Sequence, residues 1–140
     1  MDDIAVALPQ RASSLLKLVL SRTSVPVSRT EASVLSALAE RPRRITELAA
    51  RERVTQPAIT LLVNRLEQRG WAARHADQAD RRVVLVALTD QGEDALSRLR
   101  AEYRALMHEE MATLPDEDLD TLTQAIEILD GLIERLGGQE

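Results

Sequence analysis

Residues 80–92 read DRRVVLVALTDQG, and this stretch decides the fold. Within it, residues 82–88 are β-branched and aliphatic with almost no charge, which predicts a β-strand. Residues 71–75 predict a second strand, so the polar run 76–81 between them is expected to be the tip of a β-hairpin. Thr89 then predicts the N-cap of a following helix.

Two short helices are predicted before the hairpin. The first is expected over 47–53 with Thr46 as its N-cap, and the second over 56–69 with Thr55 as its N-cap. Gly70 is expected to end the second helix. Two short helices joined by a few residues form a helix-turn-helix, and the hairpin that follows is expected to be its wing.

Longer helices are predicted on either side of this unit. Apolar residues recur at helical spacing over 7–22, with Pro9 in the first turn. Ser28 and Glu31 form a capping box for a helix that ends before Pro42. Two further helices follow the hairpin, over 90–112 and 115–136. The fold class is therefore mainly α with a small β-hairpin wing, in a single domain of 140 residues.

The charge of the chain is unevenly distributed. The net charge is −5 overall, but residues 41–82 hold ten Arg against five acidic residues, and residues 83–140 hold four Arg against fourteen acidic residues. A basic segment within an acidic chain is typical of a nucleic-acid-binding protein. The apolar share of 44% is ample for a folded domain.

Several function classes are disfavoured by composition. The absence of Cys excludes disulfides, thiolate metal sites and thiol nucleophiles, and His75 and His108 lack a metal-ligand spacing. No phosphate-binding glycine loop and no combination of nucleophile, base and orienting group is present, so we expect neither an enzyme nor a cofactor. Asp2 and Asp3 stand where a signal peptide carries positive charge, and no segment has the roughly 20 apolar residues of a membrane span. A cytoplasmic protein without membrane contact is expected.

The helix over 56–69 is expected to pack one face into the core and to leave the opposite face free to contact a partner. Its core face is expected to consist of Ala58, Leu62 and Leu66. The opposite face carries residue types that read base edges in the major groove, namely Gln56, Pro57, Thr60, Leu61 and Asn64. The amides of Gln56 and Asn64 suit adenine. The alternative, that these are ordinary solvated positions, is disfavoured by the basic segment around them.

The sequence resembles the MarR family of bacterial transcription regulators over nearly its whole length. The residues that carry the resemblance are ITELA at 45–49, TQPAIT at 55–60, RLEQRGW at 65–71 and the 80–92 stretch, which is similar to the family's wing signature of D-x-R, an apolar strand and L-T-x-x-G. The resemblance implies a winged helix-turn-helix dimer. Many relatives have a basic residue after the position of Thr60, whereas this chain has Leu61, which favours apolar contact with a thymine methyl.

The resemblance also assigns roles in the wing. Arg82 is expected to enter the minor groove, where a narrow groove has enhanced negative potential. Asp80 is expected to brace the wing by pairing with an Arg, because phosphate repels its charge. The residues expected at DNA are Thr55, Gln56, Pro57, Thr60, Leu61, Asn64, Arg65, Arg74 and Arg82. Phosphate contacts are also considered for Arg43, Arg44, Arg51 and Arg53, with about half of the candidate arginines expected to be ordinary surface charges.

The resemblance divides the domain into two functional parts. Residues 1–25 and 90–140 are expected to form a helical dimerisation body, and residues 28–88 a winged helix-turn-helix lobe that binds DNA. The expected dimer interface consists of Leu8, Leu15, Leu119, Leu122, Ile126, Leu129, Ile133 and Leu136. A small-molecule effector is expected in a crevice between body and lobe, lined by Leu15, Leu16, Val19, Trp71 and Tyr103.

The sequence therefore predicts a sequence-specific DNA-binding regulator that binds double-stranded DNA as a homodimer. A repressor is favoured, and an activator is the alternative. Two-fold symmetry places the recognition helices about 34 Å apart and predicts a pseudo-palindromic operator. The effector would release the protein from DNA by favouring one of two lobe spacings. The alternative is a winged-helix module that binds protein through the Leu61 face, and a steep loss of affinity with salt would distinguish the two.

Overall fold

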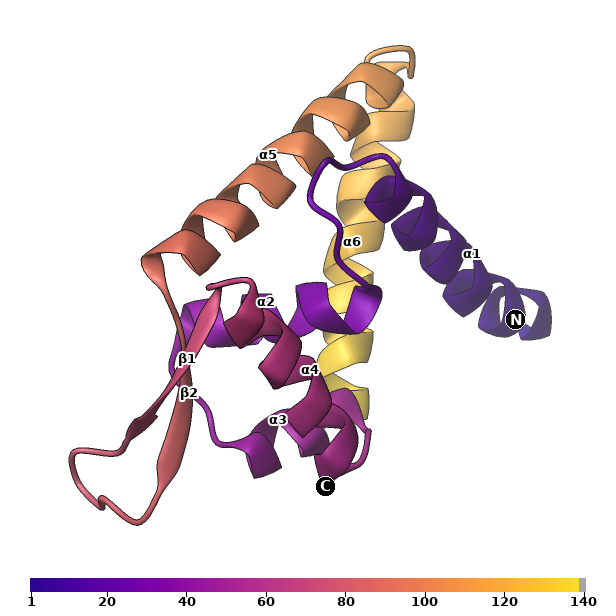
Figure 1. The fold of residues 1–140 in the computed structure, drawn as a ribbon. Coiled ribbons are helices and arrows are strands. Elements are labelled where there is room, and N and C mark those ends of the chain that lie inside the picture. Colours follow the sequence, from indigo (N-terminus) through magenta and orange to yellow (C-terminus); the bar gives the residue numbers. More distant parts are fainter. Residues whose placement is uncertain (139–140) are drawn as a thin grey trace. The chain divides into compact units, whose positions relative to one another are not determined.

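The computed structural model describes residues 1–138, which form six helices and one β-hairpin (Figure 1). In chain order the elements are α1 (Asp2–Ser21), α2 (Arg29–Glu40), α3 (Ile45–Glu52), α4 (Gln56–Gln68), β1 (Ala72–Ala76), β2 (Val84–Leu88), α5 (Asp90–Met111) and α6 (Asp116–Gly137). The prediction of a mainly α fold with a small β-hairpin is confirmed.

The chain forms two compact units that divide within α5, between Tyr103 and Arg104. The first unit contains the helix-turn-helix and the hairpin, and the second contains the end of α5 and α6. Among the described residues, no helix is long and apolar enough to cross a membrane. The division into a dimerisation body and a DNA-binding lobe stays a prediction.

The core of the first unit is aliphatic. Its largest fully buried side chains come from α2, α3, α4, β2 and α5, and they are Val34, Leu35, Leu48, Ile59, Val63, Leu66, Val86 and Leu99. Trp71 and Tyr103 pack against this core without being fully buried. The core therefore holds the two helices of the helix-turn-helix and the base of the hairpin in one body.

The helix starts that depend on local sequence agree with prediction. Ser28 Oγ accepts a hydrogen bond from the Glu31 backbone N–H at 3.1 Å, and Glu31 Oε1 accepts one from the Ser28 N–H at 3.3 Å. Thr55 Oγ1 accepts from the Ala58 N–H at 3.3 Å and so caps α4. These caps satisfy backbone donors that a helix leaves free in its first turn.

Two helix starts differ from prediction. α1 begins at Asp2 rather than at residue 7, so Pro9 lies inside the helix and not in its first turn. The carboxylates of Asp2 and Asp3 in the first turn favour this earlier start, because they complement the positive end of the helix dipole. α3 begins at Ile45 with Arg44 as its N-cap, and Thr46 is inside the helix.

The α3 start is set by a contact that is distant in sequence. Arg43 pairs with Val86 of β2 through two backbone hydrogen bonds, at 2.9 Å from the Arg43 N–H and at 2.7 Å from the Val86 N–H. The chain is therefore still extended at Arg44, and Glu47 Oε1 accepts from the Arg44 N–H at 3.5 Å. This bridge also anchors the hairpin to the helix-turn-helix.

The hairpin is antiparallel, with Ala72 opposite Leu88 and Ala76 opposite Val84. The second strand begins at Val84 rather than at residue 82, because a turn at the tip includes a hydrogen bond from the Val83 N–H to the Asp80 carbonyl at 3.0 Å. In Figure 1 the hairpin extends away from α2, α3 and α4. Its tip is thus free of the helices of its own unit.

The junction between hairpin and α5 explains the L-T-x-x-G pattern. Thr89 Oγ1 donates a hydrogen bond to the Gly70 carbonyl at 2.5 Å and accepts one from the Gly92 N–H at 3.0 Å. A Cβ at Gly92 would lie 2.1 Å from the Trp71 carbonyl oxygen. Glycine is therefore required where α5 starts against the end of α4 and the start of β1.

Candidate nucleic-acid interface

The exposed face of α4 carries most of the residues that the sequence assigns to the major groove. Gln56, Pro57, Leu61 and Asn64 are exposed, and Leu61 has an exposed fraction of 61%. Thr60 is half-buried. An exposed apolar side chain such as Leu61, among uncharged polar neighbours, is suited to contact with a base edge.

One residue of the predicted core face is placed differently. Ala58 is exposed, and the buried positions of α4 are Ile59, Leu62, Val63 and Leu66. Steps of four residues, as in the predicted set, drift around a helix that has 3.6 residues per turn. Ala58 therefore joins the exposed surface of α4, which sequence reasoning missed.

The wing tip presents a fully accessible arginine. The Arg82 side chain is 91% exposed. It donates two hydrogen bonds to the Asp80 carboxylate, from Nε to Oδ1 at 3.0 Å and from Nη2 to Oδ2 at 3.1 Å. The Arg82 backbone N–H also donates to Asp80 Oδ1, at 3.1 Å. These bonds hold the pKa of Asp80 below its ordinary value and raise that of Arg82. Asp80 thus orients Arg82 on the tip.

Arg81 is a further exposed cation at the wing tip that the predicted DNA-binding set omits. It lies beside Arg82 in the segment between the two strands. Residues 76–81 are polar and turn-forming, and this composition could have indicated from sequence that Arg81 is exposed.

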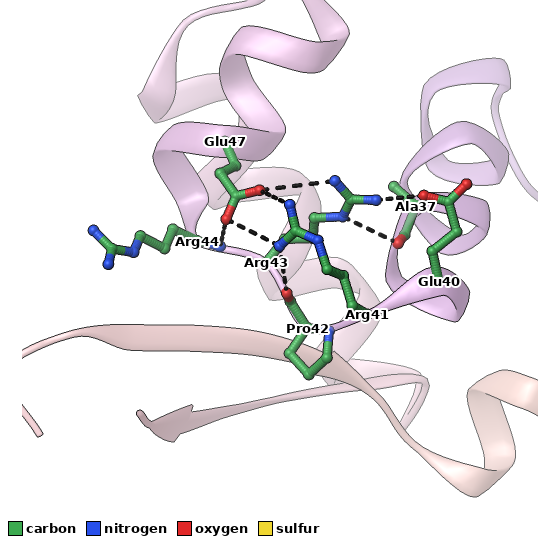
Figure 2. Close-up of polar contacts among 7 residues, drawn as sticks. All are labelled: Ala37, Glu40, Arg41, Pro42, Arg43, Arg44 and Glu47. Carbon is green, nitrogen blue, oxygen red and sulfur yellow. Dashed lines mark hydrogen bonds and ion pairs between the residues drawn. The ribbon is translucent and has the colours of Figure 1, made fainter. Parts of the chain in front are cut away.

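Arg43, which the sequence offered as either a phosphate contact or an ordinary surface charge, is buried and paired within the chain. Figure 2 shows its guanidinium between the end of α2 and the start of α3. Arg43 Nε donates to the Ala37 carbonyl at 3.2 Å, Nη2 pairs with Glu40, and Nη1 lies 3.7 Å from Glu47. Since the residue is only 9% exposed, its charge is used within the chain.

The two arginines beside Arg43 differ, because the Arg41 side chain pairs within this cluster and the Arg44 side chain does not. Arg41 Nη2 pairs with Glu47 Oε2 at 2.8 Å, and this hydrogen bond lowers the pKa of Glu47. In Figure 2 the Arg44 side chain points away from the cluster. Other exposed arginines of the helix-turn-helix include Arg44, Arg51, Arg53 and Arg65.

Arg74 and Asn64, both predicted at DNA, are bonded to each other. Arg74 Nη2 donates to Asn64 Oδ1 at 3.0 Å, and Nη1 forms an ion pair with Glu67. Another arginine, Arg69, donates to the Pro26 carbonyl at 2.6 Å and stacks over the Trp71 ring. Both arginines therefore connect elements of the first unit.

Two of the predicted effector residues share a cavity in the described part of the chain, and a third lines a different one. Leu16 and Tyr103 line an open cavity of about 530 Å³ together with Arg29, Ser33 and Glu52, whereas Trp71 lines a separate cavity of about 280 Å³. Val19 is buried and Leu15 is exposed. Leu15 and Leu16 are adjacent on α1, so their side chains diverge by about 100°.

The predicted dimer residues are largely uncovered. None of the residues of α6, all within the described range, is buried. Ile126 is 58% exposed and Ile133 is 65% exposed, and Leu122 and Leu136 are exposed as well. Leu119 and Leu129 of α6 and Leu8 of α1 are half-buried. Within residues 1–138, no group of three or more acidic or histidine side chains is arranged to hold a metal ion.

Comparisons with known proteins agree with this geometry. The sequence model of the MarR family matches residues 25–83. An uncharacterized HTH-type transcriptional regulator of Mycobacterium bovis, Mb0904, is 31% identical over 112 residues, which cover 79% of this chain and 78% of that protein. The HTH-type transcriptional repressor MdtR of Bacillus subtilis is 34% identical over 76 residues, so the match spans 54% of this chain but only about half, 49%, of MdtR.

Solved structures share the fold. YusO of Bacillus subtilis superimposes with a TM-score of 0.69 at 29% identity, covering 96% of this chain and 94% of YusO. The transcriptional regulator BldR of Sulfolobus solfataricus gives 0.67 at 29% identity, covering 89% and 93%. The regulators in this family act by binding DNA and are not enzymes. The chain therefore belongs to the MarR family of winged helix-turn-helix transcriptional regulators.

Proposed function

We propose that this protein is a repressor that binds a pseudo-palindromic operator as a homodimer, with α4 in the major groove and the wing tip in the minor groove. The observation that carries the proposal is the pairing, in one compact unit, of an exposed, uncharged α4 face with the fully accessible Arg82 on the wing tip. The first suits base edges and the second suits the negative potential of a narrow minor groove.

Dimerisation is proposed from the exposed apolar row of α6. Burying apolar surface is worth roughly 25 cal/mol per Å², so a row that includes Ile126 and Ile133 favours association with a second copy. A two-fold dimer presents two α4 helices to successive turns of the major groove, about 34 Å apart. The operator is therefore expected to have two symmetric half-sites.

Repression and effector control extend the proposal. MdtR and YetL, two matching proteins of Bacillus subtilis, are named as repressors, which supports the same sign of regulation here. The cavity beside Leu16 and Tyr103 is the proposed effector site. A protein of the same fold, CouR of Rhodococcus jostii RHA1, was solved with bound p-coumaroyl-CoA. Acting on chromosomal DNA, the protein would work in the cytoplasm.

The test is selection of DNA fragments from the source genome, followed by binding measurements at several salt concentrations. We expect one enriched symmetric site, two chains per site, and a logarithm of the binding constant that falls linearly with the logarithm of salt concentration. Failure to enrich any sequence, or binding that does not respond to salt, would contradict DNA binding. The exposed Leu61 face would then be assigned to a protein partner.

A further inference from the structure

Arg74 holds the side-chain amide of Asn64 in one orientation, and we propose that it thereby sets which base Asn64 reads. The inference rests on the proposed function, since it requires the exposed face of α4 to lie in the major groove. Asn64 belongs to that face, and Arg74 belongs to β1 of the wing. The hydrogen bond from Arg74 Nη2 to Asn64 Oδ1, at 3.0 Å, joins the two elements.

Glu67 holds the other side of the Arg74 guanidinium. It lies three residues after Asn64 on α4, on the same side of the helix, and its carboxylate forms an ion pair with Arg74 Nη1. The Arg74 and Glu67 side chains are 29% and 32% exposed, so solvent only partly screens the pair. Because the guanidinium is a planar fork, fixing Nη1 also fixes the direction of Nη2.

This arrangement changes what Asn64 offers to DNA. A free asparagine amide is a bidentate partner for adenine, because its oxygen accepts from adenine N6 while its nitrogen donates to N7. In this chain one lone pair of Asn64 Oδ1 accepts from Arg74, and this bond holds the oxygen toward β1, so the amino group is the part of the amide that we expect to face a base. An amino group donates only, and the base edge with two neighbouring acceptors is that of guanine, with O6 and N7. Asn64 held by Arg74 therefore favours guanine over adenine.

Arg74 is accordingly a positioning residue and not a phosphate contact. Both of its terminal nitrogens are used within the chain, and Glu67 compensates its charge. A phosphate-binding arginine contributes equally to all sequences and to the salt dependence of binding. A positioning arginine instead acts on the preference at one base pair in each half-site.

The experiment is selection by the full-length protein from a library of randomised DNA duplexes, with sequencing of the bound fraction. The wild type should enrich a symmetric site with guanine at the Asn64 position. Arg74→Met keeps an apolar stem and frees the amide, so the preference there should move from guanine toward adenine by about five- to tenfold. Arg74→Lys retains a donor for Oδ1 and should keep most of the guanine preference.

Two further variants separate positioning from other roles. Arg65→Met removes an exposed arginine from the same helix, and it should weaken binding to all sequences without changing the base at the Asn64 position. Asn64→Ala should abolish the preference at that position, and Arg74→Met should add no change in that background. Circular dichroism of each variant establishes that it is folded.

Unchanged base preference in folded Arg74→Met, or an altered preference that persists in the Asn64→Ala background, would overturn the inference. If Arg74→Met does not fold, Asn64→Asp supplies the test, because its carboxylate still accepts from Arg74 but has no donor. Guanine preference should then be lost, and its retention would equally overturn the inference. A wild-type chain that enriches no sequence would instead contradict the proposed function itself.

Discussion

α4 and α6 both carry a row of apolar side chains at helical spacing, but only the row of α4 is buried. Ile59, Val63 and Leu66 are fully buried in the core of the first unit. None of the residues of α6, which lies within the described part of the chain, is buried, and Ile133 is 65% exposed. The same periodicity thus has two uses. We infer that the apolar row of α4 stabilises its own chain, whereas the exposed apolar row of α6 packs against a second copy of the chain.

The largest effect is expected from a charge placed in the α6 row. Ile126→Asp would bury an unpaired carboxylate at each half of a symmetric dimer, and each such charge costs about 3 to 5 kcal/mol. The dimer dissociation constant should therefore rise by at least about a thousandfold, as measured by analytical ultracentrifugation. Ile128→Asp is the matched control, because Ile128 is exposed to a similar degree, 66% against 58% for Ile126, but lies off the row. A dimer that survives Ile126→Asp would assign the row to something other than dimerisation.

The next effect concerns the buried side of α4. Leu66→Ala leaves a cavity in an aliphatic core, so the free energy of unfolding should fall by about 2 to 5 kcal/mol in chemical denaturation. Leu61→Ala on the exposed side should change it by less than about 0.5 kcal/mol. Equal losses for the two variants would show that the exposed face of α4 also packs within the chain.

A smaller effect is expected at the start of α4. Thr55→Ala removes the acceptor for the Ala58 N–H and should lower the free energy of unfolding by about 1 kcal/mol. Thr55→Ser keeps the hydroxyl and should restore most of this loss. If Ser and Ala variants unfold at the same denaturant concentration, the cap does not stabilise the helix.

Features that depend on neighbouring residues could be predicted from sequence, and those that depend on distant contacts could not. The caps at Ser28, Thr55 and Thr89 are local, and all three are present. The start of α3 at Ile45 and the burial of Arg43 depend on pairing with Val86, which is 43 positions away. No pattern within α3 contains that information.

The same limit applies to the candidate site. The exposed α4 face and the Asp80–Arg82 pair follow from helical periodicity and from two nearby residues on one turn. The bond between Arg74 and Asn64 requires β1 to fold back along α4, so the composition of the segment indicated only that Arg74 was basic. Sorting the arginines into structural and accessible ones needed the structure.

The most direct test compares Arg82→Ala with Gln56→Ala in operator binding at several salt concentrations. Arg82 is a charged, accessible wing residue, so its loss should weaken binding by about tenfold or more and reduce the salt slope by about one. Gln56 is uncharged, so its loss should leave the slope nearly unchanged while relaxing preference at one base pair in each half-site. Folded Arg82→Ala with wild-type affinity and slope would contradict the account, because it would show that the wing does not contact DNA.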